Sequence, residues 1–128
     1  MSDALRVVGL DHVVLNVADV ERALAFYCVE LGLAPVRVEE WRQGDAPFPS
    51  ARVDSSTIID FLSRARTGEN TDHICLVVEA VDLDAVKASG RFEVVDGPGT
   101  RFGAQGDGTS LCVRDPDGNT VELRHYGA

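Results

Sequence analysis

The sequence predicts an α+β fold built from two tandem modules, each ordered strand–helix–strand–strand–strand. Apolar alternating runs begin at Asp11 and at Asp72, 61 residues apart. A helix-start signal follows each run, and each half closes with a short apolar strand that carries one internal carboxylate, Asp60 or Glu122. Self-similarity at a fixed period indicates an internal repeat. The 128 residues therefore predict a single domain whose modules span about 7–64 and 70–126.

The first module is expected to begin with the alternating strand Asp11–Val17. Asp19 is a favourable N-cap and Gly32 a favourable stop, which predicts a helix over Val20–Leu31. Three further segments are expected to be strands, with a loop at Gly44–Pro49 between the first two: Pro35–Trp41, Ser50–Asp54 and Thr57–Leu62.

The second module repeats this order from the strand Asp72–Val78. Asp82 and Gly90 predict the limits of a helix over Leu83–Ser89. The glycine-rich stretch Gly97–Gly108 is expected to be a loop. Asp115–Gly118 has Pro and Gly at turn positions, which predicts a hairpin. The strands expected in this half are Arg91–Val95, Thr109–Arg114 and Asn119–Arg124.

Composition and charge exclude several classes of function. The chain has 12 Lys and Arg against 21 Asp and Glu, a net charge of −9, which argues against nucleic acid and against anionic membrane surfaces. No apolar run approaches the ~18 residues of a membrane span, and no signal peptide is evident. Three scattered cysteines argue against a disulfide framework and against a structural zinc site. We therefore expect a cytoplasmic protein with reduced thiols.

Strand alternation places one imidazole and one carboxylate on the same face of each module. The opposite face is aliphatic in both halves and is the natural seat for the helix. This leaves His12 with Asp60 in the first half, and His73 with Glu122 in the second. Two curved half-sheets set side by side would point these four side chains into one concavity. Only three histidines occur in the chain, so the matched placement of two of them favours a shared site.

Imidazole nitrogen and carboxylate oxygen suit one divalent ion among Ni, Zn, Mn, Co and Fe. Two histidines and one or two carboxylates leave coordination positions open for water or substrate. Such an ion can polarise a substrate oxygen, while Glu122 or Asp60 acts as a catalytic proton shuttle. The alternative for Glu122 is a buried pair with Arg124 or a histidine, without metal. Whether Asp60 is a ligand stays open.

Four further residues are candidates for substrate binding by alternation. They are Asn16, Ser110, Cys112 and Arg114. The alternative is ordinary strand polarity. Nothing in the sequence marks Cys112 as an activated nucleophile.

Several segments between Gly9 and Tyr126 resemble the vicinal oxygen chelate superfamily. This superfamily includes glyoxalase I, extradiol dioxygenases, fosfomycin- and bleomycin-resistance proteins and methylmalonyl-CoA epimerase. The resemblance looks strongest to glyoxalase-domain proteins of unassigned activity. The segments that carry it are Leu10–Val13, Ala25–Leu33, Asp72–Ile74 and Arg114–Leu123.

The resemblance implies two βαβββ modules whose curved mixed sheets form a barrel-like cavity. It also implies a divalent metal held by His12, Asp60, His73 and Glu122. Small members are usually homodimers with the site at the subunit interface, and many exchange modules between chains. The family commonly has Glu or Gln where Asp60 stands, and Asp is one methylene shorter. A triad of two histidines and Glu122 would suit Fe(II).

Three functions follow from this resemblance. A metal-dependent enzyme that binds a small substrate through vicinal oxygens, with glyoxalase-I-like lyase or isomerase chemistry, is favoured. An Fe(II) extradiol-type dioxygenase is the second, although strand 109–114 offers no Tyr or His as an acid. The third, suggested by the net charge of −9, is a metal-free drug-binding protein of the bleomycin-resistance kind.

Overall fold

The computed structural model describes residues 4–65, 67–114 and 118–127. The chain divides into two compact units. The N-terminal unit comprises His12–Asp72, and the C-terminal unit comprises Met1–Asp11 together with His73–Ala128. The first strand, β1 (Val7–Val17), begins in the C-terminal unit and ends in the N-terminal unit. Each unit is described separately.

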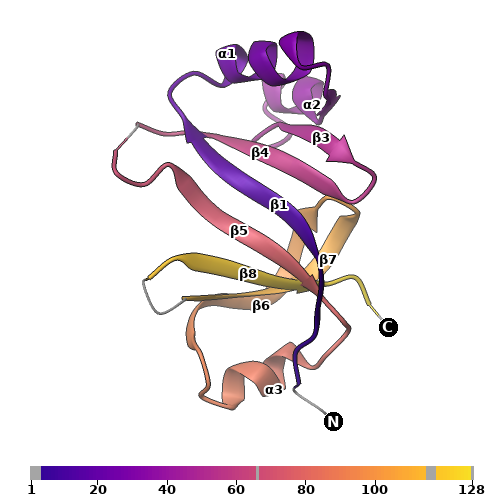
Figure 1. Ribbon diagram of the computed structural model, residues 1–128, viewed down its shortest axis with the longest axis vertical. Helices are drawn as coiled ribbons and strands as arrows, with labels where there is room; N and C mark the ends of the chain where they lie inside the picture. Colours follow the sequence, from indigo (N-terminus) through magenta and orange to yellow (C-terminus); the bar gives the residue numbers. More distant parts are fainter. Residues whose placement is uncertain (1–3, 66, 115–117, 128) are drawn as a thin grey trace. The chain divides into compact units, whose positions relative to one another are not determined.

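The N-terminal unit contains the later part of β1 and three more strands in the order β2-β3-β4-β1. β4 runs parallel to β1, whereas β3 is antiparallel to both β2 and β4. Helices α1 and α2 lie at the same end of this unit (Figure 1). The elements after β1 are α1 (Val20–Leu24), the π-helix η1 (Ala25–Glu30), β2 (Ala34–Val36), α2 (Val38–Arg42), β3 (Ser50–Asp54) and β4 (Thr57–Ser63).

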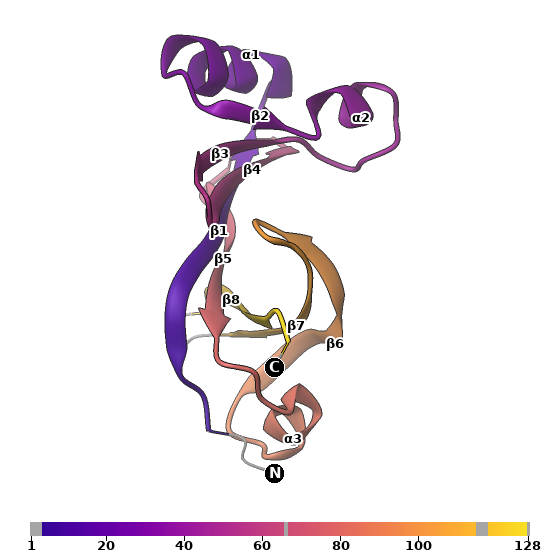
Figure 2. The same ribbon diagram turned by 90° about the vertical axis from the view of Figure 1, so that its right-hand side faces the viewer.

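The C-terminal unit repeats this topology with the strand order β5-β8-β7-β6. β8 runs parallel to β5, and β7 is antiparallel to both β8 and β6. Figure 2 shows β6 and β7 as a long curved hairpin. The elements are β5 (Thr71–Val78), α3 (Leu83–Ala88), β6 (Glu93–Gly103), β7 (Gly106–Arg114) and β8 (Thr120–His125). The predicted α+β class and βαβββ repeat are therefore confirmed.

Both predicted helix starts have the expected caps. Asp19 Oδ1 accepts a hydrogen bond from the Arg22 amide at 3.1 Å, and Asp82 Oδ1 accepts one from the Ala85 amide at 3.1 Å. These bonds satisfy amides that have no partner within the helix. Helical structure continues to Glu30 through η1 and to Ala88 in α3. The predicted helices are confirmed, although the first changes from α to π winding at Ala25.

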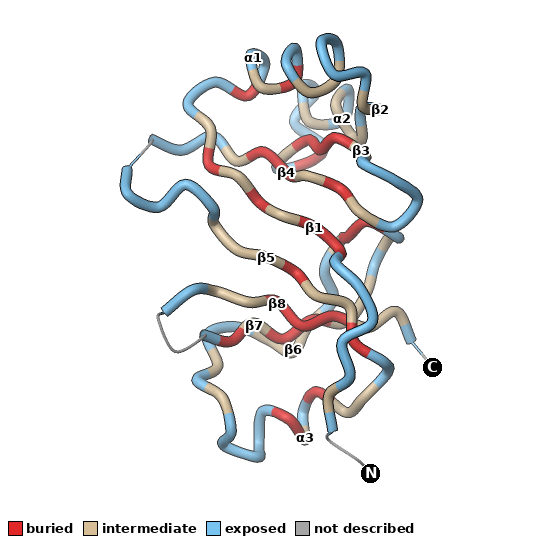
Figure 3. The backbone as a smooth tube through the Cα atoms, viewed as in Figure 1, coloured by how far each residue is buried: buried red, intermediate tan, exposed pale blue. Residues whose placement is uncertain are grey.

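Each helix packs on the aliphatic face of its own unit, as predicted. In the N-terminal unit, Val20 and Leu24 of α1 pack with Ala51 and Phe61. The equivalent core of the C-terminal unit consists of Val78, Leu83, Val86, Leu111, Val113 and Leu123. Figure 3 shows these buried stretches in red on the strands and helices of both units. The faces opposite the helices therefore carry the polar candidates.

The predicted strand over Pro35–Trp41 is wrong beyond its first residues. β2 ends at Val36, and Arg37 adopts a left-handed conformation with φ 57°. This conformation reverses the extended path and lets α2 begin at Val38. The apolar spacing of this segment did not distinguish a short strand from a short helix.

The predicted loop over Gly97–Gly108 is also wrong. β6 continues to Gly103 and β7 begins at Gly106, with register shifts near Asp96. Two glycines here provide space: a Cβ on Gly103 would lie 2.5 Å from Arg124 Nη1, and one on Gly108 would lie 2.8 Å from the His125 carbonyl. The glycines therefore mark close approach within a hairpin rather than a loop.

The remaining elements agree with the sequence. β3, β4 and β8 lie within a residue of the predicted strands, and β7 pairs with β8 so that Arg114 lies opposite Thr120. The first three residues of the predicted turn, 115–117, lie outside the described residues. Within the described part of the chain, no helix has the length and apolarity needed to span a membrane.

Candidate metal centre

The N-terminal unit brings His12 of β1 next to Asp60 of β4. Both side chains are almost completely buried, and His12 Nε2 lies 3.8 Å from Asp60 Oδ2. The other carboxylate oxygen, Oδ1, accepts a 2.5 Å hydrogen bond from Ser50 Oγ. The parallel register places Asp60 opposite Val14, two residues after His12 and therefore on the same face.

The C-terminal unit brings His73 of β5 next to Glu122 of β8. His73 Nε2 lies 3.0 Å from Glu122 Oε1, and Glu122 is only 5% exposed. The other carboxylate oxygen, Oε2, accepts hydrogen bonds from Ser110 Oγ at 2.7 Å and from Arg124 Nη2 at 2.9 Å. Glu122 lies opposite Cys75, which is again two residues after the histidine.

The repeat of the fold therefore extends to the candidate ligands. In each unit, one carboxylate oxygen accepts a hydrogen bond from a serine and the other faces the histidine of the same unit. The serines are not equivalent by register, because Ser50 lies opposite Asp60 whereas Ser110 lies opposite Arg124. The same arrangement is therefore reached by two different serine positions.

The donor distances can be compared with those around a divalent ion. Ligand bonds of about 2.0–2.2 Å at angles of about 90–110° separate two donor atoms by about 2.8–3.6 Å. The 3.0 Å between His73 and Glu122 fits this range, and the 3.8 Å between His12 and Asp60 exceeds it. The C-terminal pair is thus compatible with two ligands of one ion. The shorter Asp60 side chain lies farther from its histidine.

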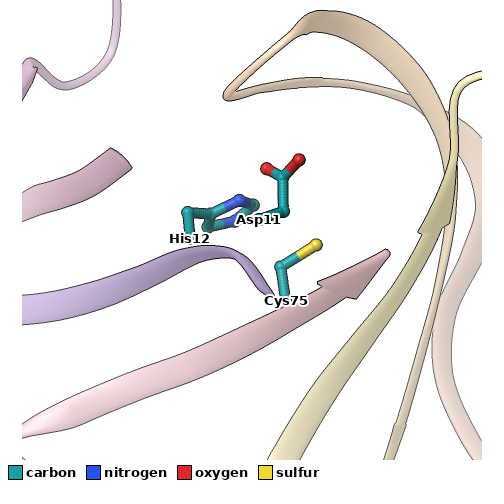
Figure 4. A group of neighbouring side chains, drawn as sticks. All are labelled: Asp11, His12 and Cys75. Carbon is teal, nitrogen blue, oxygen red and sulfur yellow. The ribbon is translucent and has the colours of Figure 1, made fainter. Parts of the chain in front are cut away.

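A buried ionic network surrounds Glu122 and contains the pair with Arg124 that the sequence left open as an alternative. Arg124 and Asp11 have no exposed surface, and Arg124 Nε lies 4.0 Å from Asp11 Oδ2. Asp11 also accepts hydrogen bonds from the Ala104 amide at 3.0 Å and from the Tyr126 hydroxyl. Figure 4 shows Asp11 and Cys75, two buried side chains of the C-terminal unit, together with His12, the residue that follows Asp11. The sequence did not predict that Asp11 and Tyr126 belong to this network.

Charge and burial shift several pKa values in this network. Burial and the hydrogen bond to Asp11 raise the pKa of Tyr126 to about 12. Burial and the nearby Glu122 charge raise the pKa of Cys112 to about 11. Burial acts to lower the pKa of Arg124, but the charge and hydrogen bond of Glu122 raise it above its ordinary value. At neutral pH this region therefore holds a neutral phenol, a neutral thiol and a guanidinium.

The four predicted substrate-binding residues have different surroundings. Ser110 is buried against Glu122, and Cys112 is half-buried directly opposite it in the register. Asn16 is buried, and its Nδ2 donates to the Glu69 carbonyl at 3.1 Å. Arg114 is exposed and donates 2.9 Å and 3.1 Å bonds to Thr120 Oγ1 and the Gly118 carbonyl. Ser110 and Cys112 therefore adjoin a candidate ligand, while Arg114 bonds across its own hairpin.

A separate pocket of about 590 Å³ lies among α1, η1, β2 and α2 of the N-terminal unit. Its rim includes Glu21 and Glu39, which both bind Arg42, at 2.8 Å and 2.7 Å. Neither His12 nor Asp60 lines it. The pocket is thus distinct from the candidate metal ligands of this unit.

The sequence model of the Glyoxalase/Bleomycin resistance protein/Dioxygenase superfamily matches residues 9–123. The chain therefore belongs to this superfamily, as its motifs predicted. It is 32% identical over 126 residues to the glyoxalase domain-containing protein RDO1 of Mycosarcoma maydis, covering 95% of this chain and 70% of that protein. It is 29% identical over 121 residues to the virulence protein STM3117 of Salmonella typhimurium, covering 91% and 83%.

Solved structures show the same fold. The Mn(II)-bound glyoxalase of Novosphingobium aromaticivorans matches 98% of this chain with a TM-score of 0.69 and 23% identity. This chain spans only 41% of the length of that protein. Methylmalonyl-CoA epimerase of Mycobacterium tuberculosis matches the whole chain with a TM-score of 0.62 and 21% identity, over 94% of its own length.

Proposed function

We propose that the protein is a metal-dependent enzyme that binds a small substrate through two adjacent oxygens, with lyase or isomerase chemistry like that of glyoxalase I. The observation that supports this most is the matched pairing of a histidine with a carboxylate in each module, His12 with Asp60 and His73 with Glu122. We propose that these four residues are the ligands of one divalent ion.

The two carboxylates are suited to different roles. When bound, the ion would polarise the oxygens of the substrate. Glu122 is held by Ser110 and Arg124, so it acts as the fixed ligand. Ser50 binds Oδ1 of Asp60, and Oδ2 lies 3.8 Å from its histidine, so Oδ2 is the better placed to move a proton. Glu122 Oε1 is the second candidate for that proton.

The substrate-facing residues remain part of this proposal. The raised pKa of Cys112, about 11, keeps its side chain a neutral thiol at pH 7. Cys112 therefore serves as a weakly polar wall rather than as a nucleophile. Ser110 orients Glu122, and Asn16 and Arg114 are the remaining polar contacts proposed for a substrate.

Metal analysis tests the proposal directly. Protein purified without chelator is expected to retain a divalent ion, and added Mn, Ni, Co or Zn is expected to raise the unfolding temperature of the metal-free form. His73→Ala should abolish this effect. His125→Ala is the matched control, since His125 is the third histidine of the chain and hydrogen-bonds the Gly127 amide. Absence of bound metal together with unchanged stability would overturn the proposal.

One observation favours a second function, a metal-free binding protein for cationic or aromatic small molecules. Glu122 already interacts with Arg124, Ser110 and His73, and these contacts satisfy a buried carboxylate without an ion. The net charge of −9 would also attract a cation. This function predicts ligand binding that is equal with and without chelator, whereas a metal-dependent affinity would exclude it.

The same samples distinguish two reactions. Conversion of a 2-oxoaldehyde adduct, or epimerisation at a carbon next to a carbonyl group, would support lyase or isomerase chemistry. Oxygen uptake by anaerobically iron-loaded protein, when a catechol is added, would instead assign ring cleavage.

We also propose that the active form is a homodimer with the site at the subunit interface.

A further inference from the structure

We propose that Arg124 is a positioning residue that fixes Glu122 as a ligand through Oε1 alone. This inference rests on the proposed metal-dependent function. Arg124 itself touches neither ion nor substrate in this proposal and acts through the carboxylate of Glu122.

The first step concerns the two oxygens of Glu122. Oε2 accepts hydrogen bonds from Arg124 Nη2 at 2.9 Å and from Ser110 Oγ at 2.7 Å. A carboxylate oxygen has two acceptor directions, and these two donors use both. Oε1 faces His73 Nε2 at 3.0 Å, the separation expected for two donors around one ion. Glu122 is therefore held ready to bind with a single oxygen.

The second step concerns what holds the guanidinium. Arg124 Nη1 donates to the Arg101 carbonyl at 2.8 Å and to the Gly106 carbonyl at 3.4 Å, while Nη2 donates to the Phe102 carbonyl at 2.9 Å. These carbonyls lie at the end of the hairpin formed by β6 and β7. Backbone atoms of a paired hairpin move less than side chains do, so they fix the planar guanidinium in one orientation.

The hairpin is shaped to receive this side chain. A Cβ on Gly103 would lie 2.5 Å from Arg124 Nη1 and 2.6 Å from the Tyr126 hydroxyl. Arg124 also lies 5.4 Å from the centre of the Tyr126 ring and 4.0 Å from Asp11. A completely buried arginine costs free energy unless such partners surround it. The presence of several such partners favours a role for Arg124 beyond its ion pair with Glu122.

Metal affinity is the quantity that this arrangement should control. Partners that orient a ligand typically contribute about 10- to 100-fold to metal affinity. We therefore expect Arg124→Ala to weaken Mn(II) binding, measured by electron paramagnetic resonance, by about 10- to 100-fold. Arg124→Lys should recover only part of this loss, because an ammonium cannot donate in the same planar fork.

Arg101→Ala is the matched control. It removes one guanidinium charge, as Arg124→Ala does, but from the hairpin that holds Arg124. The Arg101 side chain is half-exposed there and pairs with Asp96 at 2.7 Å. Its backbone carbonyl, which accepts from Arg124, remains. We expect its Mn(II) affinity to stay within about twofold of the original protein, since exposed pairs contribute little.

Two readouts separate positioning from general structural damage. Millimolar guanidinium should restore part of the Mn(II) affinity of Arg124→Ala, and methylammonium should not. The visible spectrum of bound Co(II) should change toward higher coordination in Arg124→Ala, because Oε2 becomes available to the ion.

If Arg124→Ala does not fold, Arg124→Lys and Ser110→Ala test the same point. Ser110→Ala removes the other donor to Oε2 with little change in volume.

The outcomes separate the two proposals. Failure of the original protein to bind any divalent ion would overturn both. Binding by the original protein, with unchanged affinity and Co(II) spectra in Arg124→Lys and Ser110→Ala, would overturn the role of Arg124 and leave the proposed function standing. Reduced affinity that guanidinium restores would support the inference.

Discussion

The two candidate carboxylates, Asp60 and Glu122, differ in the residues that bind them and in their distance from a histidine. Oδ1 of Asp60 accepts a hydrogen bond from Ser50, and its Oδ2 lies 3.8 Å from its histidine. Glu122 accepts from both Ser110 and Arg124 and lies 3.0 Å from its histidine. Because Ser110 and Arg124 orient Glu122 and its distance to the histidine suits one ion, its replacement should affect binding more strongly than replacement of Asp60.

This difference predicts separate effects of two amide variants. Glu122→Gln should weaken metal binding by about 100-fold or more, since it removes the charge of the carboxylate proposed as the fixed ligand. Asp60→Asn should weaken metal binding less and lower turnover more, because an amide cannot accept and release the proton. Calorimetric metal titration and kcat for the identified substrate measure the two effects. Equal loss of affinity in both variants would contradict the division of roles.

Tyr126 predicts a pH dependence of stability. Its hydroxyl donates to buried Asp11, and its pKa rises from 10.0 to about 12. A raised pKa in the folded state means that this stabilisation is complete below about pH 10 and is lost as the pH approaches 12. Tyr126→Phe should therefore destabilise the protein by about 1–3 kcal/mol at pH 8, and this difference should shrink above pH 10.

Urea unfolding at several pH values measures this difference. Tyr27→Phe is the control for loss of a tyrosine hydroxyl, because Tyr27 is the other tyrosine of the chain and packs on Phe61 in the N-terminal unit. A constant difference between the original protein and Tyr126→Phe from pH 8 to pH 11.5 would argue against the pairing with Asp11.

At the scale of elements, regular patterns predicted what depends on local sequence. The alternation of β1 and β5, the Asp caps and the repeat were sufficient to place most strands and helices. Composition failed at Gly97–Gly108, because the glycines there serve tertiary contacts of β6 and β7 rather than flexibility. It also failed at Arg37, where one left-handed residue ends β2 and starts α2.

Substitution by alanine is therefore expected to reduce stability by different amounts at two glycines of β6, Gly103 and Gly99. Gly103→Ala would place a methyl group 2.5 Å from Arg124 Nη1, which is buried and held by backbone carbonyls. Gly99→Ala would meet only the end of the half-exposed Arg101 side chain, at 2.7 Å, and that side chain can move. We expect a loss of about 1–3 kcal/mol for Gly103→Ala and a much smaller loss for Gly99→Ala.

Thermal or urea unfolding of both variants provides the comparison. The Gly103→Ala variant should also bind metal more weakly, because it displaces the residue proposed to position Glu122. Similar stability of the two variants would show that the hairpin adapts more readily than its contacts suggest.

At the scale of the whole molecule, each module would supply one histidine and one carboxylate to the proposed metal site. A site that needs both modules should be lost when either histidine is replaced. In a dimer that exchanges modules, a mixed dimer of His12→Ala and His73→Ala chains contains one site with neither histidine and one intact site. In a dimer without exchange, each site lacks one histidine.

Mixing subunits of these two variants therefore tests whether the dimer exchanges modules. After co-expression of His12→Ala and His73→Ala with different affinity tags, we expect the mixed dimer to bind one ion, while each parent dimer binds none. Metal content of the doubly purified mixed dimer measures this. A mixed dimer without metal would show that each site forms within a single chain, and failure to isolate any dimer would contradict the proposed homodimer.

The sequence by itself determined the superfamily, the two βαβββ modules, the helix caps and the pairs of candidate ligands. These features follow from periodicity and from residues close in the chain. Only the tertiary structure decided how Glu122 is held. Asp11 meets the Ala104 amide across 93 residues and the Tyr126 hydroxyl across 115 residues, and Arg124 reaches the hairpin carbonyls 18 to 23 residues away. Such contacts depend on how distant strands curve toward each other, and this leaves no periodic pattern in the sequence.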